Sequence, residues 1–80
     1  MARKKSSDEY GIEWKSRLKV FRAEQDLTQQ DVADKLKITR QTISGIEKGK
    51  YNPSLILAYK IANMFNVSIE EMFKFSKKDN

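Results

Sequence analysis

Between residues 28 and 47 the apolar side chains recur every three or four positions, which is the spacing of one face of an α-helix. Polar residues fill the positions between them, so the pattern predicts two short helices joined by a tight turn. Thr28 and Thr39 stand where each helix would begin, and Asp31 completes a capping box with Thr28. The side chains expected to point inward are Val32, Ala33, Leu36, Ile38 (in the turn), Ile43 and Ile46.

Three more helices are predicted outside this pair, at about residues 16–25, 54–65 and 68–73. Ser16, or the residue before it, would open the first, and Ser68 with Glu71 forms a capping box for the last. Asp26 and Asn66 occupy helix-end positions. The inward side chains are expected to be Leu18, Phe21, Leu55, Ala58, Ile61, Ala62, Phe65, Val67, Ile69 and Met72.

Both ends of this helical region alternate between apolar and polar residues. Tyr10, Ile12 and Trp14 alternate with other residues on one side, and Phe73-Lys74-Phe75 does so on the other. A period of two is typical of strands. The two segments could therefore pair as a short antiparallel ribbon.

Composition excludes several classes of chemistry. The chain has no cysteine and no histidine, which removes disulfides, thiolate metal sites and the commonest general base. No apolar run reaches membrane-spanning length, and the N-terminus lacks the apolar core of a signal peptide. The three glycines are isolated and form no phosphate-binding loop. We therefore expect a cytoplasmic protein that is not an enzyme, with no cofactor, metal, membrane contact or evident small-molecule ligand.

The net charge of +5 is unevenly distributed. Five basic residues against one acid lie between positions 35 and 50: Lys35, Lys37, Arg40, Lys48 and Lys50 against Glu47. Between positions 54 and 73 the balance reverses, with Lys60 against Glu70 and Glu71. A basic surface confined to one part of a small domain is typical of nucleic-acid binding.

The outward side chains of the second predicted helix suit DNA bases. Arginine and glutamine offer the paired hydrogen-bonding groups that distinguish guanine and adenine in the major groove. On an isolated helix such residues are usually only solvated, but here the caps, the inward aliphatics and the basic loop agree in register. The expected base contacts are Arg40 and Gln41, with smaller contributions from Thr39, Thr42 and Ser44. The expected phosphate contacts are Gln29, Lys48, Lys50, Tyr51 and Asn52.

Residues 28–47, TQQDVADKLKITRQTISGIE, resemble the helix-turn-helix of lambda-repressor-like transcription factors of the Cro/repressor (XRE) type. The resemblance covers about residues 18–73, with the small Ala33 at the helix crossing. It implies an all-α domain of five helices, to which the two-stranded ribbon could be added. One departure is Lys37, which stands where the family usually has glycine. It would have to adopt a left-handed conformation, at a cost of about 1 kcal/mol.

The resemblance also implies a structural ion pair between Arg22 and Glu47. Such a pair would fix the helix predicted at about residues 16–25 to the helix that begins after Thr39 and carries the expected base contacts. The cost of removing both charges from water opposes their attraction. The alternative is that both residues are ordinary surface charges.

The domain itself is expected to span residues 10–75, with the helix-turn-helix at 28–47. Residues 1–9 form a polar N-terminal tail and residues 76–80 a polar C-terminal tail. Arg3-Lys4-Lys5 in the first tail is either an arm that follows DNA or a solvated segment.

The resemblance predicts a transcriptional regulator that binds double-stranded DNA, most simply a repressor. One reading helix covers few base pairs, so a homodimer on a palindromic operator is expected, with an aromatic patch of Trp14, Phe73 and Phe75 at its interface. Two alternatives remain open. One is an antitoxin or restriction-control protein that represses its own operon, and the other is a protein-interaction module that binds no DNA.

Overall fold

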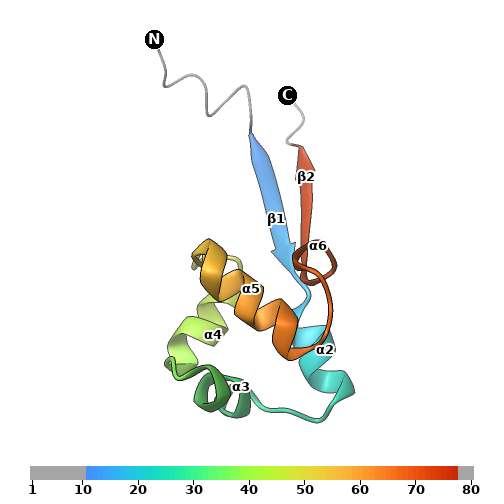
Figure 1. Ribbon diagram of the computed structural model, residues 1–80. Coiled ribbons are helices and arrows are strands. Elements are labelled where there is room, and N and C mark those ends of the chain that lie inside the picture. Colours follow the sequence, from blue (N-terminus) through green and yellow to red (C-terminus); the bar gives the residue numbers. More distant parts are fainter. Residues whose placement is uncertain (1–10, 78–80) are drawn as a thin grey trace.

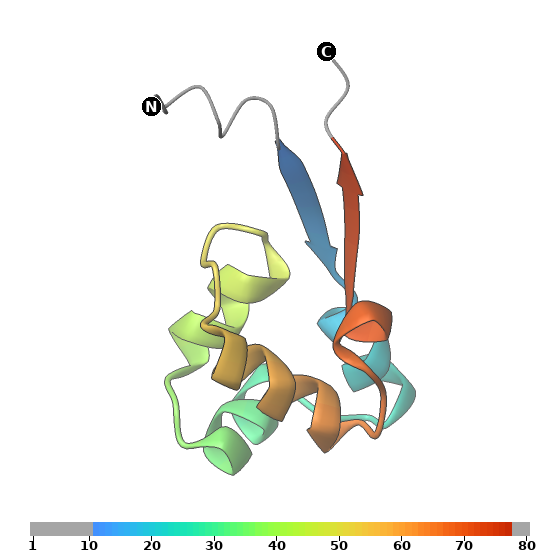
Figure 2. The ribbon, with the colours of Figure 1, turned by 45° about the horizontal axis from the view of Figure 1, so that its top comes forward.

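A computed structural model describes residues 11–77, and this range contains five helices and one two-stranded antiparallel sheet. The helices form one cluster, and the ribbon of two strands projects from one end of it (Figures 1 and 2). The elements are β1 (Ile12–Ser16), α2 (Leu18–Glu24), α3 (Gln29–Leu36), α4 (Arg40–Glu47), α5 (Leu55–Met64), α6 (Ile69–Met72) and β2 (Phe73–Lys77).

The central helix pair follows the capping pattern of its sequence. The Thr28 hydroxyl accepts the Asp31 N–H at 3.0 Å, and the Asp31 carboxylate accepts the Thr28 N–H at 2.8 Å. The Thr39 hydroxyl accepts the Thr42 N–H at 3.1 Å at the start of α4. Lys37 ends α3 in the left-handed conformation, with φ of 59°. The turn between the helices therefore forms without glycine.

Two other helix ends use the same backbone conformation. Asp26 follows α2 with φ of 56°, and Asn66 follows α5 with φ of 61°. Asparagine and aspartate tolerate this region better than most residues, because their short polar side chains bond locally. Ser54 and Ser68 cap α5 and α6 by accepting the N–H groups of Leu57 and Glu71.

The ribbon is longer at its C-terminal side than predicted. Trp14 lies opposite Phe75, and Ile12 lies opposite Lys77, so β2 continues two residues past the expected boundary at residue 75. The first helix starts at Leu18 rather than near Ser16, because Ser16 is paired with Phe73 in the ribbon. The Ser16 hydroxyl instead accepts the Leu18 N–H at 3.0 Å. Tyr10, residues 1–9 with their basic triplet, and residues 78–80 lie outside the described residues.

The core lies where α3, α4 and α5 meet and extends to the base of the ribbon. Its members are buried side chains from every helix, namely Leu18, Val32, Ala33, Ile43, Ile46, Ala58, Ile61, Ala62, Phe65, Met72 and Phe73. One inward prediction is wrong. Leu55 is 74% exposed, because it begins α5 and lines the open hollow beside the ribbon instead of the core.

Candidate nucleic-acid interface

The outward surface of α4 carries the polar side chains expected to contact bases. Arg40 and Gln41 are its first two residues and are exposed, while Thr42 and Ser44 are partly buried. Within residues 11–77, neither Arg40 nor Gln41 makes a side-chain hydrogen bond. We call Thr39, Arg40, Gln41, Thr42 and Ser44 the reading face. Its arginine and amide groups are free to meet a ligand.

The two threonines of the reading face are already hydrogen-bonded. Their hydroxyl oxygens lie 3.0 Å apart, and the Thr39 hydroxyl also caps α4. Any contact they make with a base therefore competes with, or is added to, their role in starting the helix.

A partly buried ion pair joins α2 to the end of α4. Arg22 donates to both carboxylate oxygens of Glu47, through Nε at 2.8 Å and through Nη2 at 3.1 Å. A third donation runs from Arg22 Nη1 to the carbonyl oxygen of Leu27 at 3.0 Å. The two side chains are only 15% and 6% exposed. The structure thus contains the pair that the family resemblance implied.

Gln29 takes part in the same network, which the sequence did not indicate. Its side-chain amide donates to Glu47 Oε1 at 3.0 Å. Glu47 consequently links α2, α3 and α4, and it fixes the orientation of the reading helix against both neighbours. Gln29 was expected to contact phosphate, and it begins α3 in a partly buried position. If the Gln29 amide contacted a DNA phosphate, the same NH₂ group would have to donate to both the phosphate and Glu47.

The pKa of the Glu47 carboxyl reflects opposing effects. Burial raises it, but the hydrogen bonds from Arg22 and Gln29 lower it, and the positive charges of Arg22 and Lys19 add to the lowering. The net result is a pKa below the ordinary value. The pKa of Arg22 is raised, chiefly by its hydrogen bond to Glu47. Both groups are therefore charged near neutral pH.

The loop after α4 holds the other expected phosphate contacts. Lys48, Lys50, Tyr51 and Asn52 are all exposed. Gly45 shapes this loop, because its carbonyl oxygen accepts the N–H groups of Lys50 and Tyr51 at 2.8 and 3.1 Å. A Cβ atom on Gly45 would lie only 2.9 Å from the Tyr51 Cβ. The glycine thus permits the loop to fold back onto α4.

The predicted aromatic patch is divided by the structure. Phe73 is 2% exposed and belongs to the core, where the Trp14 ring meets it edge-on with centroids 5.8 Å apart. The expectation that Phe73 lies in an exposed patch therefore does not hold for the single chain. Phe75 is 55% exposed, and Trp14 is partly buried.

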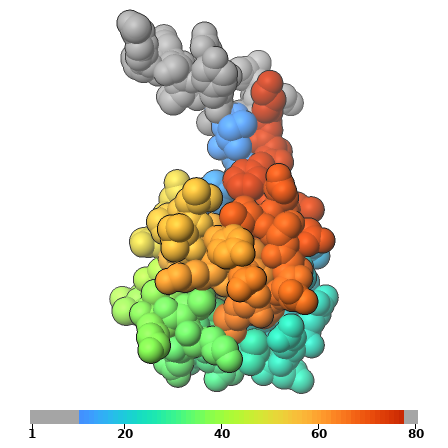
Figure 3. Space-filling model, viewed as in Figure 1, coloured from blue at the N-terminus to red at the C-terminus, as the bar shows by residue number. Residues whose placement is uncertain are grey.

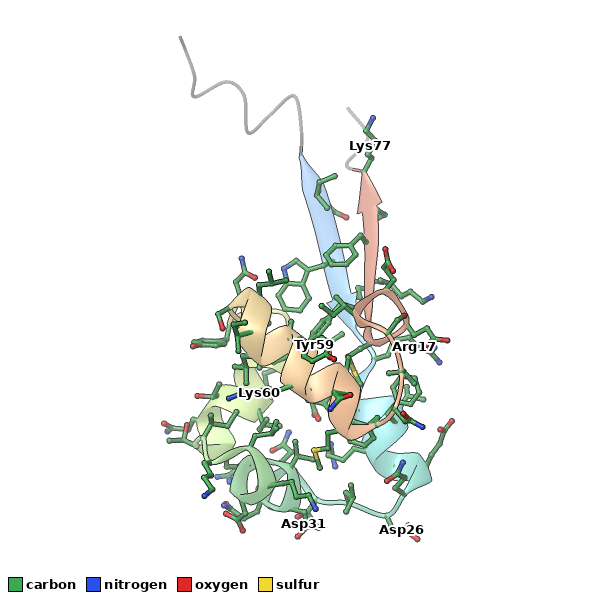
Figure 4. The ribbon with its side chains drawn as sticks, in the orientation of Figure 1. Arg17, Asp26, Asp31, Tyr59, Lys60 and Lys77 are labelled. Atoms are coloured by element: carbon green, nitrogen blue, oxygen red, sulfur yellow. The ribbon has the colours of Figure 1, made fainter. Side chains whose placement is uncertain are left out.

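Most of the exposed apolar surface near the ribbon comes from α5 instead. A hollow of about 270 Å³ lies between the ribbon and the start of α5, lined by Trp14, Asn52, Pro53, Leu55, Ala58, Ile69, Phe73 and Phe75. Tyr59 projects from the middle of α5 in Figure 4, and α5 crosses the front of the molecule below the ribbon in Figure 3. We call Ile12, Leu55, Ile56, Tyr59 and Phe75, each more than half exposed, the apolar face. Sequence periodicity placed Leu55 inward, so the exposure of this residue was not predicted.

None of the helices within residues 11–77 is both long and apolar enough to cross a membrane.

Comparisons with known proteins agree with this geometry. The family described as Helix-turn-helix matches residues 18–72. An uncharacterized HTH-type transcriptional regulator of Methanocaldococcus jannaschii is 59% identical over 59 residues, which are 74% of this chain and 89% of that protein. The immunity repressor protein of Bacillus phage phi105 is 34% identical over 53 residues, 66% of this chain but 37% of the repressor.

A solved structure also resembles this chain. A crystal structure from Bacteroides fragilis, of a protein provisionally assigned as DNA-binding, superposes with a TM-score of 0.69 at 30% identity. The match covers 76% of this chain and 98% of that one.

Proposed function

Because the chain belongs to the helix-turn-helix family of transcriptional regulators, we propose that it binds double-stranded DNA sequence-specifically and that α4 reads bases in the major groove. The observation that carries this proposal is that the reading face presents exposed hydrogen-bonding groups on a helix that is held in place by its neighbours. Arg40 and Gln41 are exposed side by side at the start of a helix whose orientation is fixed from behind by Glu47. Rigidly presented forked donors and a bidentate amide are suited to guanine and adenine edges.

The remaining contacts fall into two classes. Ser44 lies one turn beyond Arg40 on α4 and, with Thr39 and Thr42, adds smaller base contacts. The loop after α4 and the start of α3 hold the phosphate backbone through Gln29, Lys48, Lys50, Tyr51 and Asn52. Phosphate contacts position a protein on DNA, whereas contacts to base edges carry sequence information.

Selection of binding sites from a random duplex pool tests this division of roles. Arg40→Ala and Gln41→Ala should each weaken binding to the selected site by roughly 1–3 kcal/mol and relax preference at one or two base pairs. Lys48→Ala should weaken binding to all sequences alike and reduce its salt dependence. Gln25→Ala, an exposed glutamine beside Asp31 and Asp34, is the matched control and should change nothing. Unchanged base preference in Arg40→Ala would contradict the assignment of the reading face.

A homodimer on a palindromic site is the second part of the proposal. Two members of the apolar face, Leu55 and Phe75, line the hollow between the ribbon and α5, and Leu55 is 74% exposed there. Such a surface is self-complementary, since Leu55 of each protomer can enter the hollow of the other about a two-fold axis. Two protomers would place their α4 helices about 34 Å apart, in successive major grooves.

Repression is the regulatory role we favour. The immunity repressor of phage phi105 is a relative of this chain. A dimer that occupies a promoter can block polymerase by steric exclusion, a mechanism that requires no effector domain. In vitro transcription from a promoter overlapping the selected site should fall as protein is added, and the Arg40→Ala variant should not reduce it at the same concentration. A rise in transcription would indicate an activator instead.

A further inference from the structure

One side of the ribbon brings two lysines together. Lys15 of β1 lies directly opposite Lys74 of β2, and both are exposed. Glu13 shares this side further out along β1, where it lies opposite Ser76. Like charges directly opposite each other weaken a pair of strands. Within residues 11–77 neither lysine forms an ion pair with a carboxylate, so no ion pair in this part of the chain offsets the repulsion.

Lys15 also belongs to a hollow at the end of α4. This hollow has a volume of about 440 Å³ and is lined by Trp14, Lys15, Ser16, Glu47, Lys48 and Gly49. Its single carboxylate, Glu47, is already bonded to Arg22 and Gln29 through both oxygens. That carboxylate is therefore engaged elsewhere, and the hollow keeps the positive charge of Lys15 and Lys48.

The positive hollow lies at the end of a row of outward side chains on α4, which we call the stripe. Arg40, Ser44 and Lys48 are spaced four residues apart, which places them on one side of a helix. Lys48 retains right-handed helical angles as the cap of α4, with φ of −88° and ψ of −3°. The loop that follows rises beside β1 (Figure 2). The stripe thus runs from the reading face through Lys48 to Lys15 and then across the ribbon to Lys74.

We propose that Lys15 and Lys74 form a phosphate-binding surface for the DNA backbone that flanks the bases contacted by α4. This inference rests on the proposed function and adds the ribbon to its DNA interface. A bound phosphodiester would offset the repulsion between the two lysines, and the backbone contacts would extend beyond the helix-turn-helix. The competing explanation is that these lysines only discourage the exposed strands from pairing with other chains.

Salt-dependent binding to a fluorescent duplex carrying the selected site tests the inference. Lys15→Ala and Lys74→Ala should each reduce the slope of log K against log salt by roughly 0.9 per protomer, as expected for one lost phosphate contact. Affinity at about 0.1 M salt should fall roughly five- to tenfold for each. The matched control is Lys60→Ala, an exposed lysine on α5 that lies outside the basic stretch of residues 35–50. Lys60 belongs neither to the reading face nor to the hollow at the end of α4, so this variant should bind like the wild type.

A second duplex is trimmed at its flanks to the base pairs that α4 contacts. It distinguishes the loss of a contact to the flanking DNA from a general effect of lowering the protein's positive charge. On this shorter duplex the wild type and the Lys15→Ala variant should bind equally. Thermal unfolding should show that both ribbon variants are folded and at least as stable as the wild type, because each removes a repulsion.

The outcomes distinguish the inference from the function on which it rests. Ribbon variants that match the wild type in slope and affinity, while Lys48→Ala and Arg40→Ala bind more weakly, would overturn the inference alone. Ribbon variants whose only change is self-association would overturn it in favour of the strand-protection explanation. If the wild type itself showed no salt-dependent binding to any duplex, the proposed function would fail and the inference with it.

Discussion

The reading face and the apolar face lie on the same small domain but leave different kinds of groups exposed. Around α3 and α4, several polar groups are satisfied by internal hydrogen bonds. Glu47 accepts three hydrogen bonds, and Thr28 and Thr39 cap their helices. On α4, Arg40 and Gln41 are exposed and make no side-chain hydrogen bond within residues 11–77. Around the ribbon and the start of α5, apolar side chains remain outward instead, with Leu55 at 74% exposure and Phe75 at 55%.

This difference indicates two different partners. Exposed donors on a rigid helix suit a polar, anionic surface such as DNA. An apolar face beside a hollow suits a protein surface, and the proposed dimer would bring a second copy of the chain against it. The network at Glu47 concerns the first partner only, and changes there should leave the second untouched. The following predictions test that separation.

The largest effect is expected from the network that fixes the reading face. Glu47→Ala should lower the free energy of unfolding by about 1.5–3 kcal/mol, because the partly buried Arg22 guanidinium loses its carboxylate partner. Removing both partners should cost less than removing Glu47 alone. Urea unfolding of the two single variants and the double variant measures this coupling.

Glu24→Ala is the matched control for Glu47→Ala, since Glu24 is an exposed acid at the end of α2. It should change the free energy of unfolding by less than about 0.5 kcal/mol. A coupling energy near zero between Arg22 and Glu47 would mean that the pair does not stabilise the reading helix.

The apolar face should determine assembly without affecting the fold of the reading face. Leu55→Ala should weaken dimerisation roughly 10- to 100-fold, which corresponds to about 1.4–2.8 kcal/mol, because the side chain that enters the partner's hollow is shortened. Sedimentation equilibrium at micromolar concentrations measures it. Val20→Ala, at an exposed apolar position on α2, should leave the dimer intact. A wild type that is monomeric both free and on DNA would refute the dimer.

Lowering the pH should reduce the stability of the folded protein, because protonation of Glu47 weakens its bonds to Arg22 and Gln29. Its pKa is lowered from the ordinary value of 4.5 in the folded protein. The group therefore contributes stability that is present above about pH 4.5 and is lost as the pH falls through the folded-state pKa. Thermal unfolding between about pH 6 and pH 3 should show a steeper loss in the wild type than in Glu47→Gln. Some loss should remain in that variant, because hydrogen bonds to Thr28 also lower the pKa of Asp31. Equal pH dependence in both proteins would contradict the assignment to Glu47.

The smallest effect on stability is expected at Gly45, where two contributions oppose each other. Alanine favours the helix by roughly 1 kcal/mol over glycine, but its Cβ would lie 2.9 Å from the Tyr51 Cβ and displace the loop. We expect Gly45→Ala to change the unfolding midpoint little while weakening DNA binding, because Lys50, Tyr51 and Asn52 move with the loop. Gly49→Ala is a useful comparison, since no atom would crowd its Cβ, although its φ of +74° adds strain. Unchanged DNA binding by Gly45→Ala would show that the loop position is not important for the interface.

Local chemistry made the α3–α4 region predictable from sequence. Side-chain caps at Thr28 and Thr39 act on residues two or three positions away, so their pattern is visible in the sequence alone. The inward aliphatics of both helices likewise follow the helical period, and the structure buries Val32, Ile43 and Ile46 completely.

The features that depend on distant residues were harder to predict. Leu55 has the spacing of a core residue, but nothing in its own helix reveals that it lies at the hollow beside the ribbon instead of in the core. The amide of Gln29 meets Glu47, which is 18 residues away, and no local pattern encodes that contact. The contact between Gly45 and Tyr51 likewise depends on how the loop returns to α4. Such contacts require the packing of whole elements.

The most direct test of the claim that α4 reads DNA uses the absence of cysteine from the chain. Ser44→Cys introduces a single thiol in the reading face, to which an iron chelate can be attached for cleavage of bound duplex. We predict cleavage of both strands within each half of the selected site, and none from the same chelate placed by Lys35→Cys on α3. Equal cleavage from both positions, or cleavage from Lys35→Cys alone, would contradict the assignment of α4 as the reading helix.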